Sequence, residues 1–215
     1  TVVVPNPDLK PEKSLNYEAG SSFKADGVFG SDDHLFAKAV FFYDDVKDFI
    51  APKGWFEPTT PPTVYYSSQN VGHVVRKGIE LSGTYAAGQF STSVSYGLLH
   101  AVDKETNERM NGITPQSANL KLAYAFPAQA INVWYRAHWS KGGESSVEDR
   151  ATGKNLHFSS FLTHSLGAEW SPKVADLANL QAGIAVVNLF DKEYRMLNGS
   201  YGSGRGVRLC LSAQF

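Results

Sequence analysis

Hydrophobic and polar side chains alternate along much of this chain. From residue 207 to residue 215 every second residue is apolar, ending in Phe215, and the residues between them are polar or small. Successive side chains of a β-strand point to opposite faces, so this segment is predicted to be a strand with one apolar and one polar face. The same period recurs upstream, and no stretch shows a convincing helical period.

Counting this alternation along the chain predicts nine strands. They cover approximately residues 15–24, 35–43, 79–85, 90–98, 118–126, 131–139, 158–171, 178–195 and 207–215. Short connections near 26–33, 86–89, 127–129 and 171–178 alternate with long polar ones at 51–64, 103–115, 141–157 and 196–204. Antiparallel strands joined in this way have all short turns at one edge and all long loops at the other, as in bacterial outer-membrane barrels.

A soluble β-sandwich also shows alternating strands and is the main alternative. Two features favour a barrel in a bilayer. The polar faces carry mostly small residues, as in a water-filled lumen, and aromatic residues gather towards strand ends, as in interfacial girdles. These aromatic residues include Tyr43, Tyr85, Tyr124, Phe126, Trp139, Trp170 and Phe215. The predicted fold class is therefore all-β, a transmembrane antiparallel up-and-down β-barrel.

Composition and charge exclude several other classes of protein. The longest purely apolar run, around residues 39–43, is far shorter than the ~20 residues of a membrane-spanning helix. The formal net charge of −1 indicates no basic surface for nucleic acid. The single cysteine, Cys210, has no His or Asp near it in sequence, and the glycines of residues 202–206 precede a strand rather than a helix. We therefore expect neither catalysis nor nucleotide binding, and the chain is not predicted to be an enzyme.

Three segments resemble TonB-dependent outer-membrane receptors. They are NPDLKPEKSLNYEAG (6–20), NVGHVVRKGIELSGTY (70–85) and VVNLFDKEYR (186–195), and they lie in the family's order. The resemblance spans nearly the whole chain. The three segments together are specific for the family, whereas any one of them alone would be weak evidence. It implies a 22-stranded barrel with an N-terminal plug, of which this chain would supply about nine C-terminal strands. Residues 1–215 are thus expected to be the C-terminal part of the transmembrane barrel, with the plug and earlier strands upstream.

The resemblance also implies a function in the bacterial outer membrane: energy-coupled import of an iron compound, with haem as the favoured cargo. A siderophore receptor of the same family, a passive porin-like channel and an adhesin are the alternatives. No permanently bound cofactor is expected, because haem or a ferric chelate would be the transported ligand. The implied partners are an inner-membrane TonB-type energy transducer, the barrel-assembly machinery, the lipid bilayer and an extracellular haem-carrying protein. Phe215 resembles the signal that the assembly machinery reads.

Ligand capture is expected in the long loops, which carry several candidate residues. The aromatic residues of loop 51–66 lie among prolines and could either stack on a flat ligand or pack on one another. His157, where a long loop rejoins its strand, is a haem-ligand candidate by residue type, with a polar rim residue as the alternative. The predicted ligand-binding residues are Trp55, Phe56, Tyr65, Tyr66, Arg109, Met110, His157 and Tyr201. No metal site is predicted, and His164 faces lipid by parity without an assigned role.

Overall fold

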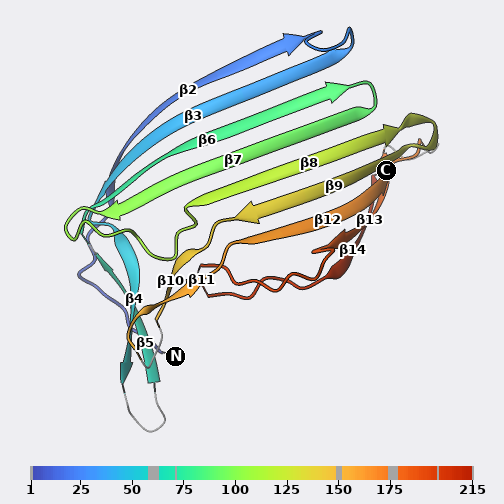
Figure 1. Cartoon of the computed structure of the whole chain (residues 1–215). Coiled ribbons are helices and arrows are strands. Elements are labelled where there is room, and N and C mark those ends of the chain that lie inside the picture. Colours follow the sequence, from blue (N-terminus) through green and yellow to red (C-terminus); the bar gives the residue numbers. More distant parts are fainter. Residues whose placement is uncertain are drawn as a thin grey trace. The chain divides into compact units, whose positions relative to one another are not determined.

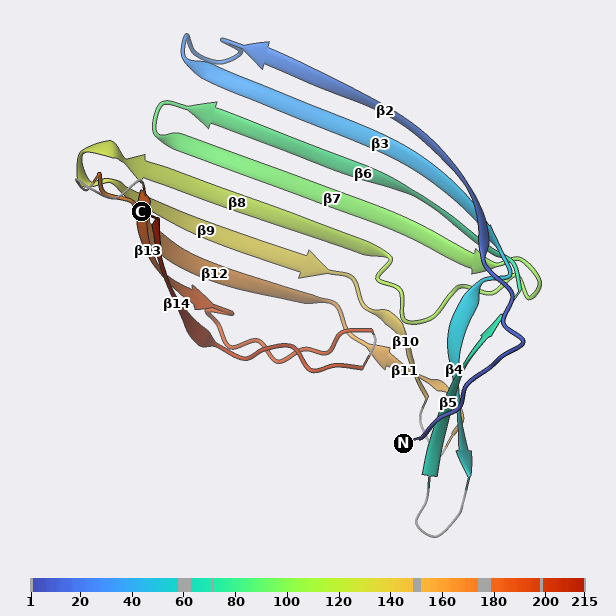
Figure 2. The same ribbon diagram turned by 180° about the vertical axis from the view of Figure 1, so that it is seen from behind.

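Nine strands form one antiparallel sheet in the computed structural model, which describes residues 2–57, 63–70, 72–148, 152–173, 179–197 and 199–214. The strand order is β14-β13-β12-β9-β8-β7-β6-β3-β2, so sheet neighbours follow one another along the chain (Figures 1 and 2). The strands are β2 (Lys13–Asp26), β3 (Asp33–Lys47), β6 (Val74–Ala87), β7 (Phe90–Asp103), β8 (Gln116–Phe126), β9 (Ile131–Ser140), β12 (Phe161–Trp170), β13 (Asn179–Val187) and β14 (Gly206–Gln214). The prediction of nine antiparallel strands is confirmed.

The chain divides into two compact units. The first comprises residues 1–19, 42–78 and 100–110, and the second comprises residues 20–41, 79–99 and 111–215. Among the described residues there is no helix long and apolar enough to cross a membrane. A 3-10 helix, η1 (Pro127–Gln129), forms the turn between β8 and β9.

In the first unit, a three-stranded sheet stands where the sequence predicted a loop. Strands β4 (Ile50–Glu57) and β5 (Thr63–Asn70) pair antiparallel, and β1 (Val2–Val3) pairs parallel to β5. The prediction of a proline-stiffened loop over 51–64 is therefore wrong for most of that range. Cross-strand pairing satisfies the backbone groups of both segments, which outweighs the low strand propensity of proline and glycine at this site.

Polar side chains of the first unit tie the N-terminal segment to this hairpin. The Nδ2 of Asn6 donates to the carbonyl of Ser68 at 3.0 Å. Asn70 accepts from the backbone N–H of Lys10 at 2.8 Å and donates to the carbonyl of the same residue at 2.9 Å. The backbone N–H of Ile50 donates to Glu12 at 2.6 Å. Asn6, Lys10 and Glu12 belong to the NPDLKPE segment. These hydrogen bonds therefore give several residues of that motif a structural role.

In the second unit, the long connection between β9 and β12 contains a further hairpin. Strands β10 (Gly143–Glu148) and β11 (Asn155–Phe158) pair antiparallel, with Glu144 opposite His157. The sequence predicted a polar loop over 141–157, and the short hairpin corrects that prediction. Its strands pair only with each other and stand outside the nine-stranded sheet.

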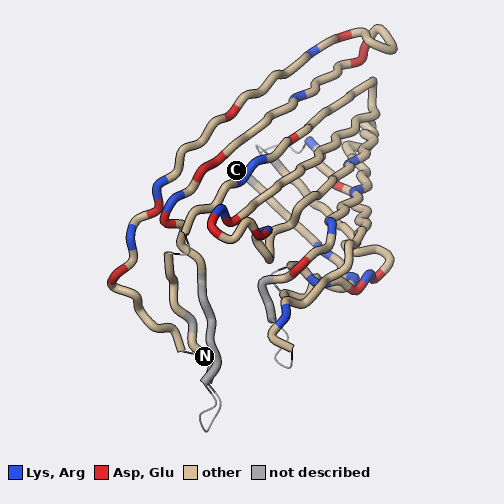
Figure 3. The backbone as a smooth tube through the Cα atoms, turned by 60° about the vertical axis from the view of Figure 1, so that its left-hand side comes forward, with Lys and Arg blue, Asp and Glu red and all other residues tan. Residues whose placement is uncertain are grey.

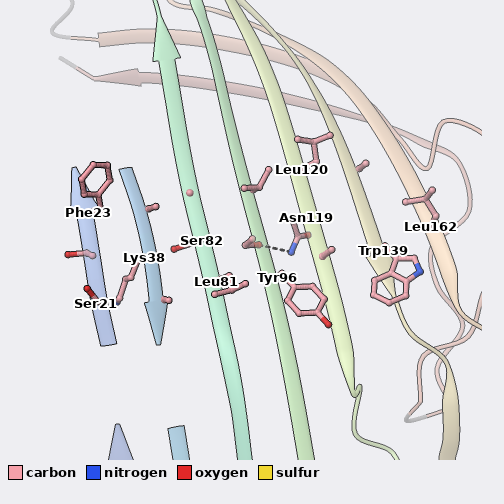
Figure 4. Close-up of a pocket in the computed structure, with 18 residues that line it drawn as sticks. Ser21, Phe23, Lys38, Leu81, Ser82, Tyr96, Asn119, Leu120, Trp139 and Leu162 are labelled. Carbon is pink, nitrogen blue, oxygen red and sulfur yellow. Dashed lines mark hydrogen bonds between the residues drawn. The ribbon is translucent and has the colours of Figure 1, made fainter. Parts of the chain in front are cut away.

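One face of the sheet in the second unit is apolar and exposed. The register places Tyr96 opposite Ala118, Ala118 opposite Trp139 and Trp139 opposite Leu162. These side chains, with others of the same face, line an open apolar hollow of about 810 Å³ (Figure 4). Leu162, Leu166, Trp170 and Ile184 are each more than two-fifths exposed. An apolar face of this extent suits hydrocarbon rather than water.

The opposite face of the same strands is polar. The Nδ2 of Asn119 donates to the hydroxyl of Ser95 at 3.2 Å across β8 and β7, and the Nδ1 of His138 lies 2.8 Å from the Oδ1 of Asn119. Long stretches of the strands are uncharged, and charged residues are more frequent towards the turns and loops (Figure 3). The division into an apolar and a polar face agrees with the sequence prediction.

Candidate functional site: a cleft between the β11–β12 junction and the segment after β13

The segment that follows β13 is held by one buried amide. Strand β13 ends at Val187 rather than at residue 195 as predicted, because Asn188 takes a left-handed conformation with φ 48°. Its Nδ2 donates to the carbonyls of Lys192 and Ser203, both at 2.9 Å, and its Oδ1 accepts from the N–H of Lys192 at 2.9 Å. Asn188 is only 5% exposed. An amide can both donate and accept, so this side chain joins the two ends of the segment.

After Asn188 the chain extends away from β13 and then returns to β14, which forms two arms that lie side by side (Figures 1 and 2). Arg195 and Tyr201 form a bridge, and the N–H of Gly202 donates to the carbonyl of Tyr194 at 2.9 Å. A Cβ atom at residue 202 would clash with the ring of Tyr194, so glycine allows this ring to lie close to the backbone of the other arm. The described residues of this segment, 188–197 and 199–205, therefore form a defined structure, which we call the β13–β14 ribbon.

A cleft of about 690 Å³ lies between this ribbon and the residues that connect β11 to β12. We call it the loop cleft. Its lining includes His157, Phe158, Phe161, Tyr194, Arg195 and Tyr201. The rings of Phe161 and Tyr194 stack with centroids 4.1 Å apart and planes 27° apart. Aromatic packing between strand and ribbon thus sets one side of the cleft.

The charged residues that line the loop cleft are Asp191, Lys192, Glu193 and Arg195, and of these Arg195 contacts the aromatic rings. Its guanidinium lies 3.9 Å from the ring centroid of Tyr201 and 5.7 Å from that of Phe158, and it donates a hydrogen bond to the hydroxyl of Tyr201. A guanidinium stacked against aromatic rings is held in a planar orientation and can bind a carboxylate through two N–H groups. The cleft therefore offers a cation within an aromatic surface, which suits a flat ligand that carries acidic groups.

His157 lies at the edge of the loop cleft. Its Nδ1 is 2.9 Å from the Oε1 of Glu144 on the neighbouring strand, and both side chains are more than half exposed. An imidazole paired on one nitrogen still presents the other to solvent or to a ligand. Among the described residues, no group of three His, Cys, Asp or Glu side chains could hold a metal ion.

The structure brings together two of the residues predicted to bind ligand, His157 and Tyr201, which both line the loop cleft. Arg109 and Met110 belong to the first unit. The Nη2 of Arg109 lies 3.1 Å from the Nδ1 of His100, and the N–H of Met110 donates to the carbonyl of Ala101 at 3.0 Å. These contacts give both residues structural partners within their own unit.

The remaining predicted residues lie on the hairpin of the first unit. Trp55 is in register with Tyr65, and Tyr65 is half-buried. The side chains of Trp55, Phe56 and Tyr66 lie outside what the structure describes, and so does Phe215. The proposed roles of these residues in ligand binding and assembly stay predictions.

Sequence reasoning missed Phe158, Tyr194 and Arg195. The predicted strand over 178–195 puts Tyr194 and Arg195 at its end, where alternation sends them to opposite faces. The signal that could have found them is Asn188, because asparagine commonly takes the left-handed conformation that ends a strand. Ending the strand there would have put Tyr194 and Arg195 in a connection beside Tyr201.

An exposed apolar face, nine antiparallel strands and connections of alternating length define an outer-membrane β-barrel protein. Residues 1–189 match the family described as "TonB dependent receptor-like, beta-barrel", and the chain belongs to this family. The family consists of receptors and transporters rather than enzymes, and it places the chain in the bacterial outer membrane. The short turns then lie at the periplasmic edge and the loop cleft at the outer edge.

Individual relatives differ in the cargo that their names state. "Heme/hemopexin utilization protein C" of Haemophilus influenzae (strain 86-028NP) is 25% identical over 96% of this chain and 29% of its own length. "Vitamin B12 transporter BtuB" of Photobacterium profundum is 29% identical over 88% of this chain and 28% of its own length. Among solved structures, "Copper transporter OprC" superposes with a TM-score of 0.72 at 19% identity, covering 94% of this chain and 31% of that one. The chain thus spans about three-tenths of the length of these proteins.

Proposed function

We propose that this chain forms the C-terminal part of the barrel of a TonB-dependent receptor that imports an iron compound, with haem as the favoured cargo. A TonB-type transducer of the inner membrane would supply the energy, and the barrel-assembly machinery would insert the protein. The observation that carries the proposal is the loop cleft, where Arg195 lies between the rings of Phe158 and Tyr201.

The chemistry of the cleft fits haem in three respects. Haem is flat and aromatic, and the cleft is lined by four aromatic side chains, Phe158, Phe161, Tyr194 and Tyr201. Haem carries two carboxylates, and Arg195 presents a guanidinium suited to them. His157, a residue type that binds haem iron, lies at the edge of the same cleft. The similarity to a haem/hemopexin utilisation protein supports the same cargo.

The test is a titration of the full-length receptor with haem, followed by visible absorption. We expect a shifted Soret band that saturates at one haem per receptor, and a clearly weaker affinity in Arg195→Ala. Arg205→Ala is the matched control, because Arg205 is an exposed arginine of the same ribbon that does not line the cleft. No Soret shift in the native receptor would contradict haem as cargo and would favour a ferric siderophore.

The energy coupling needs a separate measurement. Cells that carry the receptor should grow on haem as their only iron source, and deletion of TonB should abolish this growth. Growth that continues without TonB would indicate a passive porin-like channel instead. Binding of haem without any uptake in either strain would indicate a surface-binding protein, the adhesin alternative.

A further inference from the structure

A second, smaller pocket lies on the apolar face at the outer end of β12. It has a volume of about 380 Å³ and is lined by Trp139, Phe161, Leu162, His164, Phe190 and Lys192. We call it the rim pocket. Trp139 and Leu162 also line the large apolar hollow of the bilayer-facing surface, so the two apolar surfaces are continuous.

The β13–β14 ribbon closes one side of the rim pocket. The N–H of Leu189 donates to the carbonyl of His164 at 2.7 Å, which fixes the start of the ribbon to β12. The ring of Phe190 then contacts His164 edge-on, with centroids 4.9 Å apart, while Phe190 remains 69% exposed. An exposed phenylalanine at the bilayer-facing rim can contact hydrocarbon without any rearrangement.

His164 has a partner on this face. Its Nδ1 lies 2.5 Å from the hydroxyl of Tyr135 on the neighbouring strand. This contact gives the imidazole nitrogen and the phenol hydroxyl each a hydrogen-bond partner. The free-energy cost of placing a histidine on the apolar face is therefore lower. The pair forms a polar patch in an otherwise apolar wall beside Leu162 and Leu166.

Lys192 supplies a positive charge at the outer end of the rim pocket. The Asn188 amide holds the Lys192 backbone through two hydrogen bonds at 2.9 Å, so the side chain starts from a fixed position. None of the ion pairs found among the described residues involves Lys192. An unpaired lysine ammonium on a flexible stem is suited to a phosphate at the membrane surface.

We propose that the rim pocket binds a phosphorylated lipid of the outer leaflet. The phosphate contacts Lys192, and an acyl chain passes Phe190 and lies over Trp139 and Leu162 into the apolar hollow. The pocket has a cation at its outer end and a continuous apolar surface beyond it. A phosphorylated lipid matches this arrangement, because its charged phosphate is followed by hydrocarbon chains. Ser160, Phe161 and Lys192 line both the rim pocket and the loop cleft. The proposal still does not depend on the cargo of the receptor, because lipid binding is measured without haem.

The test is native mass spectrometry of the full-length receptor in mild detergent with two matched probes, dimyristoylphosphatidic acid and dimyristoylglycerol. They share their acyl chains and differ in the phosphate. We expect the native receptor to retain the phosphatidic acid about fivefold more strongly, and Lys192→Gln to abolish this preference. Phe190→Ala should weaken both probes equally. Lys154→Gln, which removes an exposed lysine of the β10–β11 hairpin, is the matched control and should behave as the native receptor.

Three results would overturn the proposal. The native receptor could retain both probes equally, which would leave no role for the phosphate. Lys192→Gln could keep the full preference, which would place the phosphate elsewhere. Millimolar inorganic phosphate could displace the phosphatidic acid completely, which would make the site an anion site without a role for the acyl chain. Heat-modifiable migration on gels should verify that each variant keeps a folded barrel.

Discussion

Two connections of the second unit are each organised around one buried polar side chain, yet they differ in size and use. The periplasmic turn between β2 and β3 is held by Asp33, which is 1% exposed. Its carboxylate accepts from the N–H groups of Val28, Phe29 and Gly30 at 2.7 to 2.9 Å and from the hydroxyl of Tyr85 at 3.1 Å. The outer ribbon after β13 is held by Asn188, which both donates and accepts.

The difference follows from what each connection must satisfy. A tight turn presents several N–H groups towards its inside, and a carboxylate, which only accepts, can gather them. The ribbon brings a carbonyl from each of its two arms to the same place, so it needs a donor as well as an acceptor. The turn therefore closes on itself, whereas the ribbon is long enough to present Lys192, Tyr194, Arg195 and Tyr201 around the central amide. The turn joins two strands, whereas the ribbon also carries the side chains that we propose bind the ligand.

The largest effect on ligand binding is expected from Asn188→Ala. Alanine removes three hydrogen bonds, two to the carbonyls of Lys192 and Ser203 and one from the N–H of Lys192, at about 0.5–1.5 kcal/mol each, and it is strained at positive φ. The ribbon should lose its fixed shape, and the affinity for haem should fall more than about thirtyfold. Limited proteolysis should then cut within residues 188–205. Asn111→Ala, which removes an exposed asparagine bonded to Asn155, is the control and should change neither property.

A smaller effect is expected from Arg195→Lys. The charge is retained, but the planar guanidinium that lies 3.9 Å from the Tyr201 ring is lost. We expect haem affinity to fall about tenfold while the proteolysis pattern stays native. Equal affinities for the native receptor and the variant would show that the cleft needs only a positive charge at this place.

Tyr201→Phe should have a smaller effect still. The ring against Arg195 is retained, and only the hydroxyl that accepts from the guanidinium is removed. One hydrogen bond at an exposed site predicts a loss of about two- to threefold in the Soret titration. A loss as large as that of Arg195→Lys would mean that the hydroxyl contacts the ligand directly.

Asp33→Asn should leave ligand binding unchanged and affect only its own turn. In the native protein the backbone N–H groups of this turn donate to both oxygens of the Asp33 carboxylate. In the variant an amide NH₂ group replaces one of the oxygens, so a donor faces donors. We expect about tenfold faster hydrogen exchange at the amides of Val28, Phe29 and Gly30, with native exchange in the ribbon. Slowed or altered exchange in residues 188–205 would show that the two connections are not independent.

Much of the fold was predictable because it follows from a period of two. Residues such as Leu162, Leu166 and Trp170 fall on one face whatever the tertiary structure, and the lengths of the connections identify the two edges of the sheet. The hairpins β4–β5 and β10–β11 were missed because their strands carry Pro52, Gly54 and polar residues instead of an alternating apolar face.

The candidate site was predictable only in part. His157 and Tyr201 were identified because they are chemically suited residues in long connections. Their proximity was not predictable, since 43 residues separate them (157 to 201) and the two segments meet through tertiary contacts such as the packing of Phe161 on Tyr194 and of Arg195 on Phe158. Arg195 was missed because its strand was predicted to continue past Asn188.

The sequence by itself determined that this chain forms antiparallel membrane strands with one lipid-facing side, because alternation of side chains is a local property of the backbone. Only the tertiary structure decided which residues of the long connections share a surface. That choice depends on one buried amide at residue 188, which ends a strand, folds the ribbon back and turns Arg195 to the cleft and Phe190 to the bilayer-facing rim. Hydrogen bonds between residues distant in sequence carry no periodic signal, so three-dimensional packing was needed to reveal them.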